Sequence, residues 1–342
     1  TTTATTLSVS TLTDQSGFSF SSSGSSWISS TGSFTLSSPI SFILHLIGTG
    51  AGTHAAFRSL TDPSGNSVDL SHLVCYSGET YCSMLIPYTS GQSVTNGTWS
   101  YQLKSSTNSP SAFTVRMTSR TGTTPTSTTL TLQPYMTGSS FSTATVSTAL
   151  TRMATIAAQN DITLSIQSLI QVSGSQYGTI NTSFNDSTTS SLVSMGGAST
   201  LNVFFVEDFS GSGSGSLGVS PGIPGAQGIA GNRNGVLISL TAHQISGSVD
   251  TNLMAETALH EAGHFLGLFH TTESAGTTFD PISDTPQCTT AQDTNSDGKV
   301  SATECQALDG TNLMFWQGTT SFSQSTLTTS QRAVLRTTPL AQ

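Results

Sequence analysis

Short apolar runs recur through the first third of the chain, and polar turns separate them. The clearest turns lie at residues 62–66 and 96–97, where proline, glycine and asparagine gather. Short runs of branched and aromatic residues between such turns are typical of β-strands. Regularly spaced short strands predict a sandwich or jelly roll. We therefore expect an all-β accessory domain over residues 1–119, with strands near 18–20, 34–36, 40–47, 84–86, 99–103 and 113–117.

The alternation of short apolar runs and polar turns ends after residue 119. Residues 120–140 are rich in threonine, serine, proline and glycine, which predicts a linker. Apolar residues then recur at helical spacing over 143–159, which predicts a helix. The apolar run at 201–205 is typical of a central strand, and a second run at 235–241 predicts another strand. We place a second domain, with both helices and strands, at residues 141–342.

The segment 260–270 reads HEAGHFLGLFH and contains three of the seven histidines. Residues four apart lie on one face of a helix, so His260 and His264 can bind one metal ion. Glu261 lies beside that ion, where its carboxylate can act as general base toward a bound water. Gly267 permits a sharp exit from the helix, which can bring in His270 as a third ligand. Three nitrogen ligands with a fourth position open are typical of catalytic zinc. The alternative is a core helix with incidental histidines.

The histidine spacing matches the extended metzincin signature. Met314 lies in the sequence NLMFW at 312–316, where metzincins place a methionine in a tight turn beneath the zinc. The region resembles the pappalysin (ulilysin-like) group of metzincins, or a diverged sister family. The resemblance is carried by residues 260–271, by Asp-Thr-Pro at 284–286, by the methionine segment, and by Gln331 and Arg332.

This resemblance implies an α+β metzincin-like catalytic domain that hydrolyses peptide bonds in protein substrates. Pappalysins carry a tyrosine two positions after the turn methionine, which stabilises the transition state, and this chain has Trp316 there. Trp316 is therefore a candidate transition-state or pocket residue, although an indole can only donate a hydrogen bond. In metzincins the strand before the zinc helix lines the cleft. We expect an extended substrate to lie antiparallel to residues 236–240.

An acidic loop at 293–304 matches the twelve-residue EF-hand calcium pattern. Gly298 permits the sharp bend at the sixth position. The alternative is an acidic, solvated turn without a metal. We predict a structural Ca²⁺ ion held by the side chains of Asp293, Asn295, Asp297, Ser301 and Glu304 and by the carbonyl of Lys299.

Four cysteines occur as two close pairs and allow three pairings. We expect disulfides Cys75–Cys82 and Cys288–Cys305, because each pair lies within one predicted domain. Disulfides indicate an extracellular, oxidising compartment. The chain begins at Thr1, which predicts a processed, mature form unless a tag has been removed. Residues 62–65 and 97–100 resemble accessory domains of secreted bacterial peptidases, so we expect a secreted bacterial protein.

Charge narrows the range of partners. Only 8% of the 342 residues are charged, and the formal net charge is −9. A net negative charge argues against nucleic acid or an anionic membrane surface as partner. No stretch of the sequence is long and apolar enough to predict insertion into a membrane.

The sequence thus predicts a secreted endopeptidase that uses Zn²⁺, contains Ca²⁺, and acts on proteins or peptides. The alternative from another class is an extracellular adhesion or structural protein whose zinc domain is inactive or auxiliary. A peptide assay with and without a zinc chelator distinguishes them. The N-terminal domain could attach the peptidase to a surface or a glycan, or it could only add stability.

Overall fold

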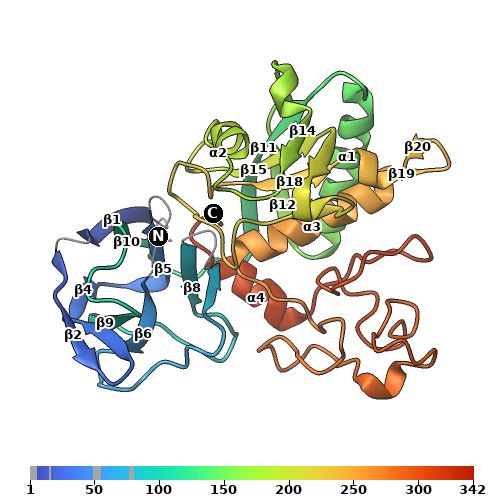
Figure 1. The fold of residues 1–342 in the computed structure, drawn as a ribbon. Coiled ribbons are helices and arrows are strands. Elements are labelled where there is room, and N and C mark those ends of the chain that lie inside the picture. The colour runs from blue at the N-terminus through green and yellow to red at the C-terminus, as the bar shows by residue number, and fades with distance from the viewer. Residues whose placement is uncertain (1–5, 15–16, 49–54, 77–80) are drawn as a thin grey trace.

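The computed structural model describes residues 6–14, 17–48, 55–76 and 81–342. Two packed units make up the fold, and Figure 1 shows them side by side. The first, called the β-unit below, contains the described residues up to Thr121. The second, called the peptidase unit, begins at β11 (Thr128–Thr137).

Two antiparallel sheets form the β-unit. The first has the strand order β1 (Thr6–Asp14), β10 (Phe113–Thr121), β5 (Pro39–Gly48), β8 (Tyr81–Ile86) and β7 (Val74–Tyr76). The second has the order β2 (Phe20–Ser23), β3 (Ser26–Ser29), β9 (Gly97–Ser105) and β4 (Gly32–Leu36), and β6 (Ala56–Thr61) also pairs with β9. One buried cluster joins the two sheets, and its aromatic members include Phe34, Phe42, Phe57, Trp99 and Tyr101.

The first sheet is buried on both faces at β5 and β8. Every residue of β8 is buried, and so are most residues of β5. A strand covered on both faces reads as a continuous apolar run rather than an alternating one. Phe42 and Met84 face the cluster inside the β-unit, whereas their neighbours Ile43 and Leu85 belong to the core of the peptidase unit. The second face of this sheet is therefore the contact between the two units.

A mostly parallel sheet forms the centre of the peptidase unit. Its strand order is β12 (Ile162–Ile166), β11, β15 (Leu201–Val206), β18 (Val236–Ser239) and β17 (Gly218–Val219). Only β17 pairs antiparallel, and β13 (Ile170–Val172) pairs with β11 beyond the end of β12. The predicted central strand at 201–205 is confirmed as β15.

Helices cover both faces of this sheet. On one face α1 (Thr143–Gln159) and α3 (Thr251–Leu266) pack side by side on the apolar side chains of the strands. The helix predicted at 143–159 is thus confirmed. The other face packs against α2 (Ser187–Val193) and the strand pair β14 (Thr179–Asn181) and β16 (Asp208–Ser210). Short elements complete this part: η3 (Ser175–Tyr177), η4 (Gly211–Gly213), η5 (Thr241–His243), β19 (Gln244–Ile245) and β20 (Ser248–Val249).

Two sequence expectations are wrong in detail. Residues 128–137 of the predicted linker form β11, a strand with neighbours on both sides. Its threonines are β-branched and suit a strand, so composition alone misled the prediction. The strand near 236–240 is not open to a substrate either, because β18 lies between β15 and β17. The terminal strand of the sheet on this side is β17.

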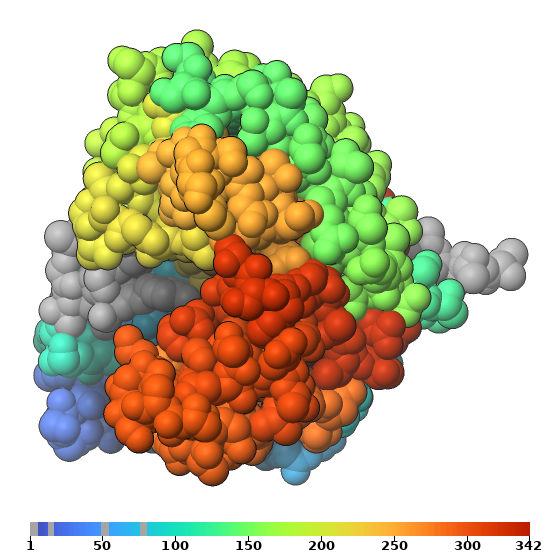
Figure 2. Space-filling view, turned by 90° about the vertical axis from the view of Figure 1, so that its right-hand side faces the viewer, coloured from blue at the N-terminus to red at the C-terminus, as the bar shows by residue number. Residues whose placement is uncertain are grey.

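The chain after α3 is largely irregular until α4 (Thr329–Thr337), apart from the short η6 (Thr290–Gln292). In Figure 2 this orange to red segment forms a compact lobe beneath the elements of the parallel sheet. A small buried cluster around the disulfide Cys288–Cys305, with Val300, Ala302 and Phe315, lies within it. Among the described residues, no helix has the length and apolar character needed to cross a bilayer.

Candidate zinc site and substrate cavity

Helix α3 carries the first two histidines and ends at Leu266, just before the glycine of the histidine motif. Asp250 caps its N-terminus by accepting hydrogen bonds from the backbone N–H groups of Asn252 and Leu253. Gly267 ends the helix in the left-handed conformation, with φ of 111°. Leu268 then donates its N–H to the Gly263 carbonyl at 2.9 Å. This glycine-capped turn redirects the chain so that His270 returns beneath the helix.

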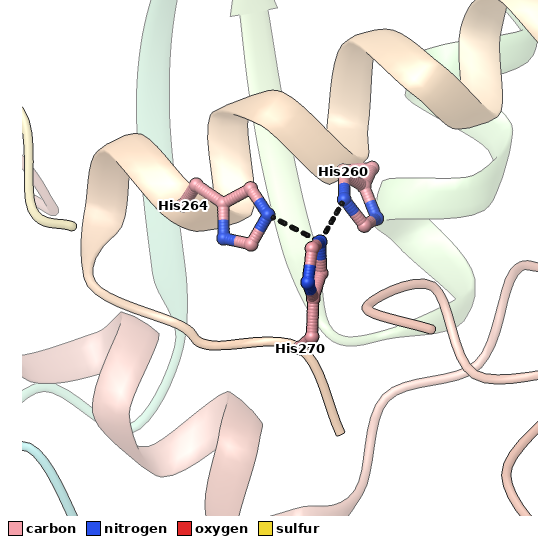
Figure 3. A group of neighbouring side chains, drawn as sticks. All are labelled: His260, His264 and His270. Atoms are coloured by element: carbon pink, nitrogen blue, oxygen red, sulfur yellow. Dashed lines mark hydrogen bonds between the residues drawn. The ribbon is translucent and has the colours of Figure 1, made fainter. Parts of the chain in front are cut away.

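The three histidine side chains converge on one point, as Figure 3 shows. The Nε2 atom of His270 lies 3.2 Å from Nε2 of His260 and 3.0 Å from Nε2 of His264. The opposite ring nitrogens all face fixed acceptors. Nδ1 of His260 lies 2.7 Å from the Leu313 carbonyl, Nδ1 of His264 lies 2.8 Å from the Leu268 carbonyl, and Nδ1 of His270 lies 3.0 Å from the Glu273 carboxylate.

These anchors determine which atoms face the centre. A carbonyl or carboxylate oxygen can only accept, so each Nδ1 carries a proton, and in the neutral ring the Nε2 atom then presents a lone pair. Burial lowers the pKa of His260 to about 3 and also lowers that of His264, so both rings stay neutral. Three lone pairs cannot hydrogen-bond to one another, but they suit one divalent cation. Neutral imidazoles oriented by outer acceptors are what zinc requires.

Glu261 lies on the same helix and lines a cavity of about 490 Å³ that also touches His260 and His270. Its side chain is only 8% exposed, and burial raises the pKa of its carboxyl group to about 8. A neighbouring cation would favour the carboxylate form. The remaining cavity wall is mixed. Its apolar side chains are Leu217, Leu253, Leu313, Phe315 and Trp316, and its polar side chains are Ser216, Glu256, Thr257, Gln317 and Gln324. A buried carboxylate beside a three-histidine centre can take and return a proton.

Met314 packs directly beneath the zinc helix. A Cβ at Gly263 would overlap the Met314 sulfur, so only glycine permits this approach. Met314 receives support from Asn312, whose side-chain oxygen accepts its backbone N–H at 2.8 Å. Its own carbonyl accepts the N–H of Thr271 at 3.0 Å. The methionine turn therefore holds both the base of the helix and the residue that follows the third histidine.

Trp316 lies at the cavity wall, but its one hydrogen-bond donor is occupied. Its indole Nε1–H donates to the Val300 carbonyl at 2.7 Å. Because an indole has no second donor, Trp316 has none to offer a developing oxyanion in this arrangement. Its contribution here is to shape the cavity and to link it to the acidic loop.

The acidic loop at 293–304 folds tightly around its own carboxylates. Asp293 accepts the backbone N–H groups of Asp297 and Gly298 at 3.2 and 3.0 Å. Asp297 accepts the N–H of Lys299 at 2.8 Å and the side-chain amide of Asn295 at 3.2 Å. Within the described part of the chain, these carboxylates do not converge as the histidines do.

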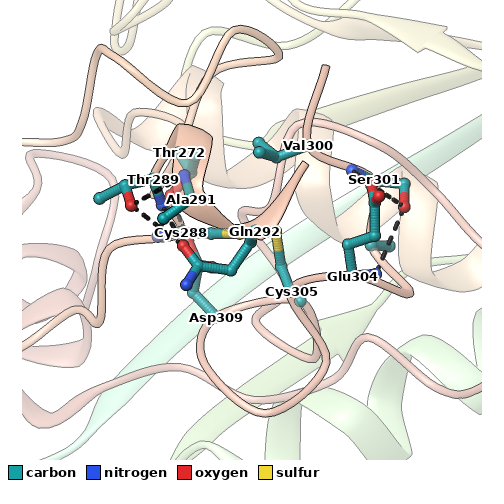
Figure 4. Close-up of a disulfide and its surroundings, with 12 residues drawn as sticks. Thr272, Cys288, Thr289, Ala291, Gln292, Val300, Ser301, Glu304, Cys305 and Asp309 are labelled. Atoms are coloured by element: carbon teal, nitrogen blue, oxygen red, sulfur yellow. Dashed lines mark hydrogen bonds between the residues drawn. A yellow bond between two sulfur atoms is a disulfide. The ribbon is translucent and has the colours of Figure 1, made fainter. Parts of the chain in front are cut away.

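The end of this loop is fixed by Glu304 and a disulfide. Glu304 accepts the N–H of Thr294 at 2.8 Å with one oxygen and that of Ser301 at 2.9 Å with the other. Figure 4 shows the Ser301–Glu304 contacts beside the disulfide Cys288–Cys305. The second expected disulfide, Cys75–Cys82, links β7 to β8.

Sequence reasoning missed three supporting residues. Glu273 lies three positions after His270 and orients its ring. The acidic residue so soon after the third histidine was the one feature of the sequence that could have indicated this role. Gly263 and Gly218 matter because side chains there would meet Met314 and Glu261, respectively. A glycine within a helical or apolar pattern indicates close approach of another group. Which group approaches depends on the tertiary fold.

Three converging imidazoles beside a buried glutamate form the site of a zinc metallopeptidase. Residues 200–335, less than half of the chain, match the model of peptidase family M43, which is described as pregnancy-associated plasma protein-A. This agrees with the pappalysin likeness of the histidine and methionine segments. No curated protein sequence matches the chain.

Two solved structures are similar to parts of the chain. Archaemetzincin from Methanopyrus kandleri is 13% identical, with 43% of this chain and 79% of that chain covered and a TM-score of 0.29. Metalloproteinase-II from Bacteroides fragilis is 15% identical, with 46% of this chain and 53% of that chain covered and a TM-score of 0.28.

Proposed function

We propose that this zinc peptidase is an extracellular endopeptidase that cleaves protein substrates, with Glu261 as general base. The observation that carries the proposal is the anchored histidine trio beside a buried carboxylate on the wall of one cavity. Bound zinc would polarise a water molecule and the scissile carbonyl. His260, His264 and His270 would hold it.

Glu261 performs the proton transfers in this proposal. Its carboxylate takes a proton from the attacking water and later delivers that proton to the leaving amine. The Glu261 carboxylate must stay in one position through both proton transfers. Its burial between α3 and β17 would hold it there. An alanine Cβ at Gly218 would lie 2.6 Å from Cγ of Glu261, so strand and carboxylate are in close contact.

An extended substrate fits the edge of β17. This strand pairs with β18 on one side and is the last strand of its sheet. Residues 215–218, at its start and just before it, line the cavity beside the histidines. A peptide added along this edge would form main-chain hydrogen bonds, which suits cleavage within a chain. The apolar side chains of Leu253 and Phe315 in the cavity wall would contact an apolar side chain of the substrate.

The test compares Glu261→Gln with the parent on an internally quenched peptide library. The variant keeps the shape of the side chain, so we expect zinc content equal to the parent and hydrolysis lowered by at least about a hundredfold. A zinc chelator should abolish parental cleavage, and added zinc should restore it. Full hydrolysis by the zinc-loaded variant would refute the role of Glu261. Chelator-insensitive cleavage would refute metal dependence.

The extracellular assignment and the calcium site belong to the same proposal. Two disulfides support an oxidising compartment. The EF-hand-like order of ligand types supports calcium at 293–304, as do the left-handed backbones at Ser296 and Gly298 that bend the loop. A calcium-selective chelator should lower the melting temperature of the zinc-loaded parent but not that of Glu304→Gln. An unchanged parental melting temperature would exclude a stabilising calcium ion.

A separate part of the proposal concerns the β-unit as an attachment module for a surface or glycan. The full-length protein with Glu261→Gln can be screened on a glycan array, so that cleavage does not interfere. Selective binding that is lost on mutation of the β-unit would support attachment. Absence of binding would leave this unit with a purely structural role.

A further inference from the structure

We propose that the β-unit is part of the zinc-binding apparatus, because Leu85 on β8 supports the turn that delivers His270. This inference rests on the proposed zinc function and gives the N-terminal third of the chain a defined task. Leu85 is a positioning residue, since it acts through the turn at 267–269 and touches neither metal nor substrate.

The direction of the Leu85 side chain is the first observation. Adjacent residues of a strand point to opposite faces. Met84 belongs to the buried cluster inside the β-unit, whereas Leu85 belongs to the cluster that contains Leu266 and Leu268 of the peptidase unit. Leu85 is only 2% exposed. A side chain from the first unit therefore completes the core directly behind the zinc helix.

The contact falls on the turn between the second and third histidines. A Cβ at Gly267 would lie 2.6 Å from Cδ2 of Leu85, so the leucine side chain packs against the glycine backbone itself. Two residues later, the ring of Phe269 lies 5.6 Å from the ring of His72, also in the β-unit. Both contacts are made to the short segment that connects His264 with His270.

A second connection reaches the last turn of the zinc helix through residues 224–227. In the β-unit, Ser83 donates to the Pro224 carbonyl at 2.6 Å, and Thr118 donates to the Gln227 carbonyl at 2.8 Å. The same loop holds the Phe265 carbonyl, which accepts the N–H of Gly225 at 2.9 Å and the side-chain amide of Gln227 at 3.1 Å. Figure 1 places β5 and β8 on the side of the β-unit that faces the peptidase unit.

These contacts add to the hydrogen bonds that Leu268 makes with the Gly263 carbonyl and with His264, which hold only the start of the turn. Residues 267–270 are outside regular structure, and His270 itself is partly exposed. A ligand on a loose segment must be ordered when the metal binds, which weakens binding. Packing Leu85 against Gly267 orders the segment in advance. Loss of a group that hydrogen-bonds directly to a metal ligand commonly lowers metal affinity by about tenfold to a hundredfold, and we expect the loss of Leu85 packing to fall at the lower end of this range.

The experiment compares Leu85→Ala with Met84→Ala in the full-length protein. The two residues are neighbours on β8, both are buried, and each substitution removes a large apolar side chain. Zinc affinity is measured by competition with a chromophoric chelator, and the visible spectrum of the Co²⁺-substituted protein reports ligand geometry. We expect Leu85→Ala to raise the zinc dissociation constant about tenfold or more and to alter the Co²⁺ spectrum. Met84→Ala should lower thermal stability but keep both zinc readouts close to the parent.

Equal zinc affinity and equal Co²⁺ spectra in the parent and Leu85→Ala would overturn the proposal. Equal losses in both variants would also overturn it, because the effect would then be general destabilisation. If Leu85→Ala does not fold, Leu85→Val applies the same test with a smaller cavity, and Leu85→Met should restore parental affinity. A parent that binds zinc without cleaving peptides would refute the peptidase mechanism and leave this test intact.

Discussion

Gly218→Ala should slow catalysis while leaving the zinc ligands in place. The backbone of Gly218 is not in the left-handed region, so alanine is sterically allowed in its conformation. The new Cβ would lie 2.6 Å from Cγ of Glu261 and 3.0 Å from Cγ2 of Thr257. Ordinary contacts begin near 3.4 Å, so the Glu261 side chain must move by roughly 0.8 Å. A displacement of about 1 Å at a catalytic group can cost about a hundredfold in rate. We expect kcat/KM to fall by about tenfold to a hundredfold, or about 1.4 to 2.7 kcal/mol in activation free energy.

The assay measures kcat and KM on a quenched peptide together with zinc content by mass spectrometry. The loss should lie mainly in kcat, because the displaced Glu261 carboxylate transfers protons and does not bind the substrate. Gly91→Ala is the matched control, since a Cβ there meets nothing within 4 Å and its backbone is also outside the left-handed region. In a Glu261→Gln background, Gly218→Ala should have little further effect, because both changes act on one group.

A role of the β17 contact in catalysis is excluded if zinc-loaded Gly218→Ala cleaves as fast as Gly91→Ala. It is also refuted if the loss in Gly218→Ala is explained by missing zinc. Either result would mean that the contact between β17 and Glu261 does not set the position of the base.

Two further predictions concern the zinc anchors and a buried histidine of the β-unit. Glu273→Ala removes the acceptor for Nδ1 of His270 and should raise the zinc dissociation constant about tenfold to a hundredfold, measured by chelator competition; an unchanged constant would contradict the anchoring role. Burial lowers the pKa of His45 from 6.5 to about 3, so between these pH values the unfolded chain binds a proton that the native state does not. The free energy of unfolding should therefore fall as the pH drops through this window, by roughly 5 kcal/mol in total at 1.36 kcal/mol per pKa unit. In denaturant titrations His45→Gln should flatten that part of the profile, and a slope equal to the parent's would show that His45 is not its source.

Local signals in the sequence predicted local structure well. The helix at 143–159 follows from its apolar spacing, and the left-handed turn at Gly267 follows from the need for positive φ. Both cysteine pairs form the disulfides expected from their separation. These features depend on residues close together in the chain, so a single sequence contains the necessary information.

The pairing of strands that are distant in the sequence could not be predicted from the pattern of apolar and polar residues. β11 looked like a linker because threonine and proline occur in both linkers and strands, and only its neighbours β12 and β15 make it central. β17 is too short to stand out, yet it separates β18 from the substrate edge. The continuous apolar run in β5 did indicate burial, but not that its second face would join the core of the peptidase unit. Each of these outcomes depends on contacts between distant segments.

The most direct test of the central claim is a crystal structure of the zinc-loaded protein with anomalous data collected across the zinc absorption edge. We expect one strong peak bonded to Nε2 of His260, His264 and His270 at about 2.0 to 2.1 Å, with the Glu261 carboxylate beside a fourth, non-protein ligand. A zinc peak elsewhere, or histidine rings turned away from a common centre, would contradict this expectation.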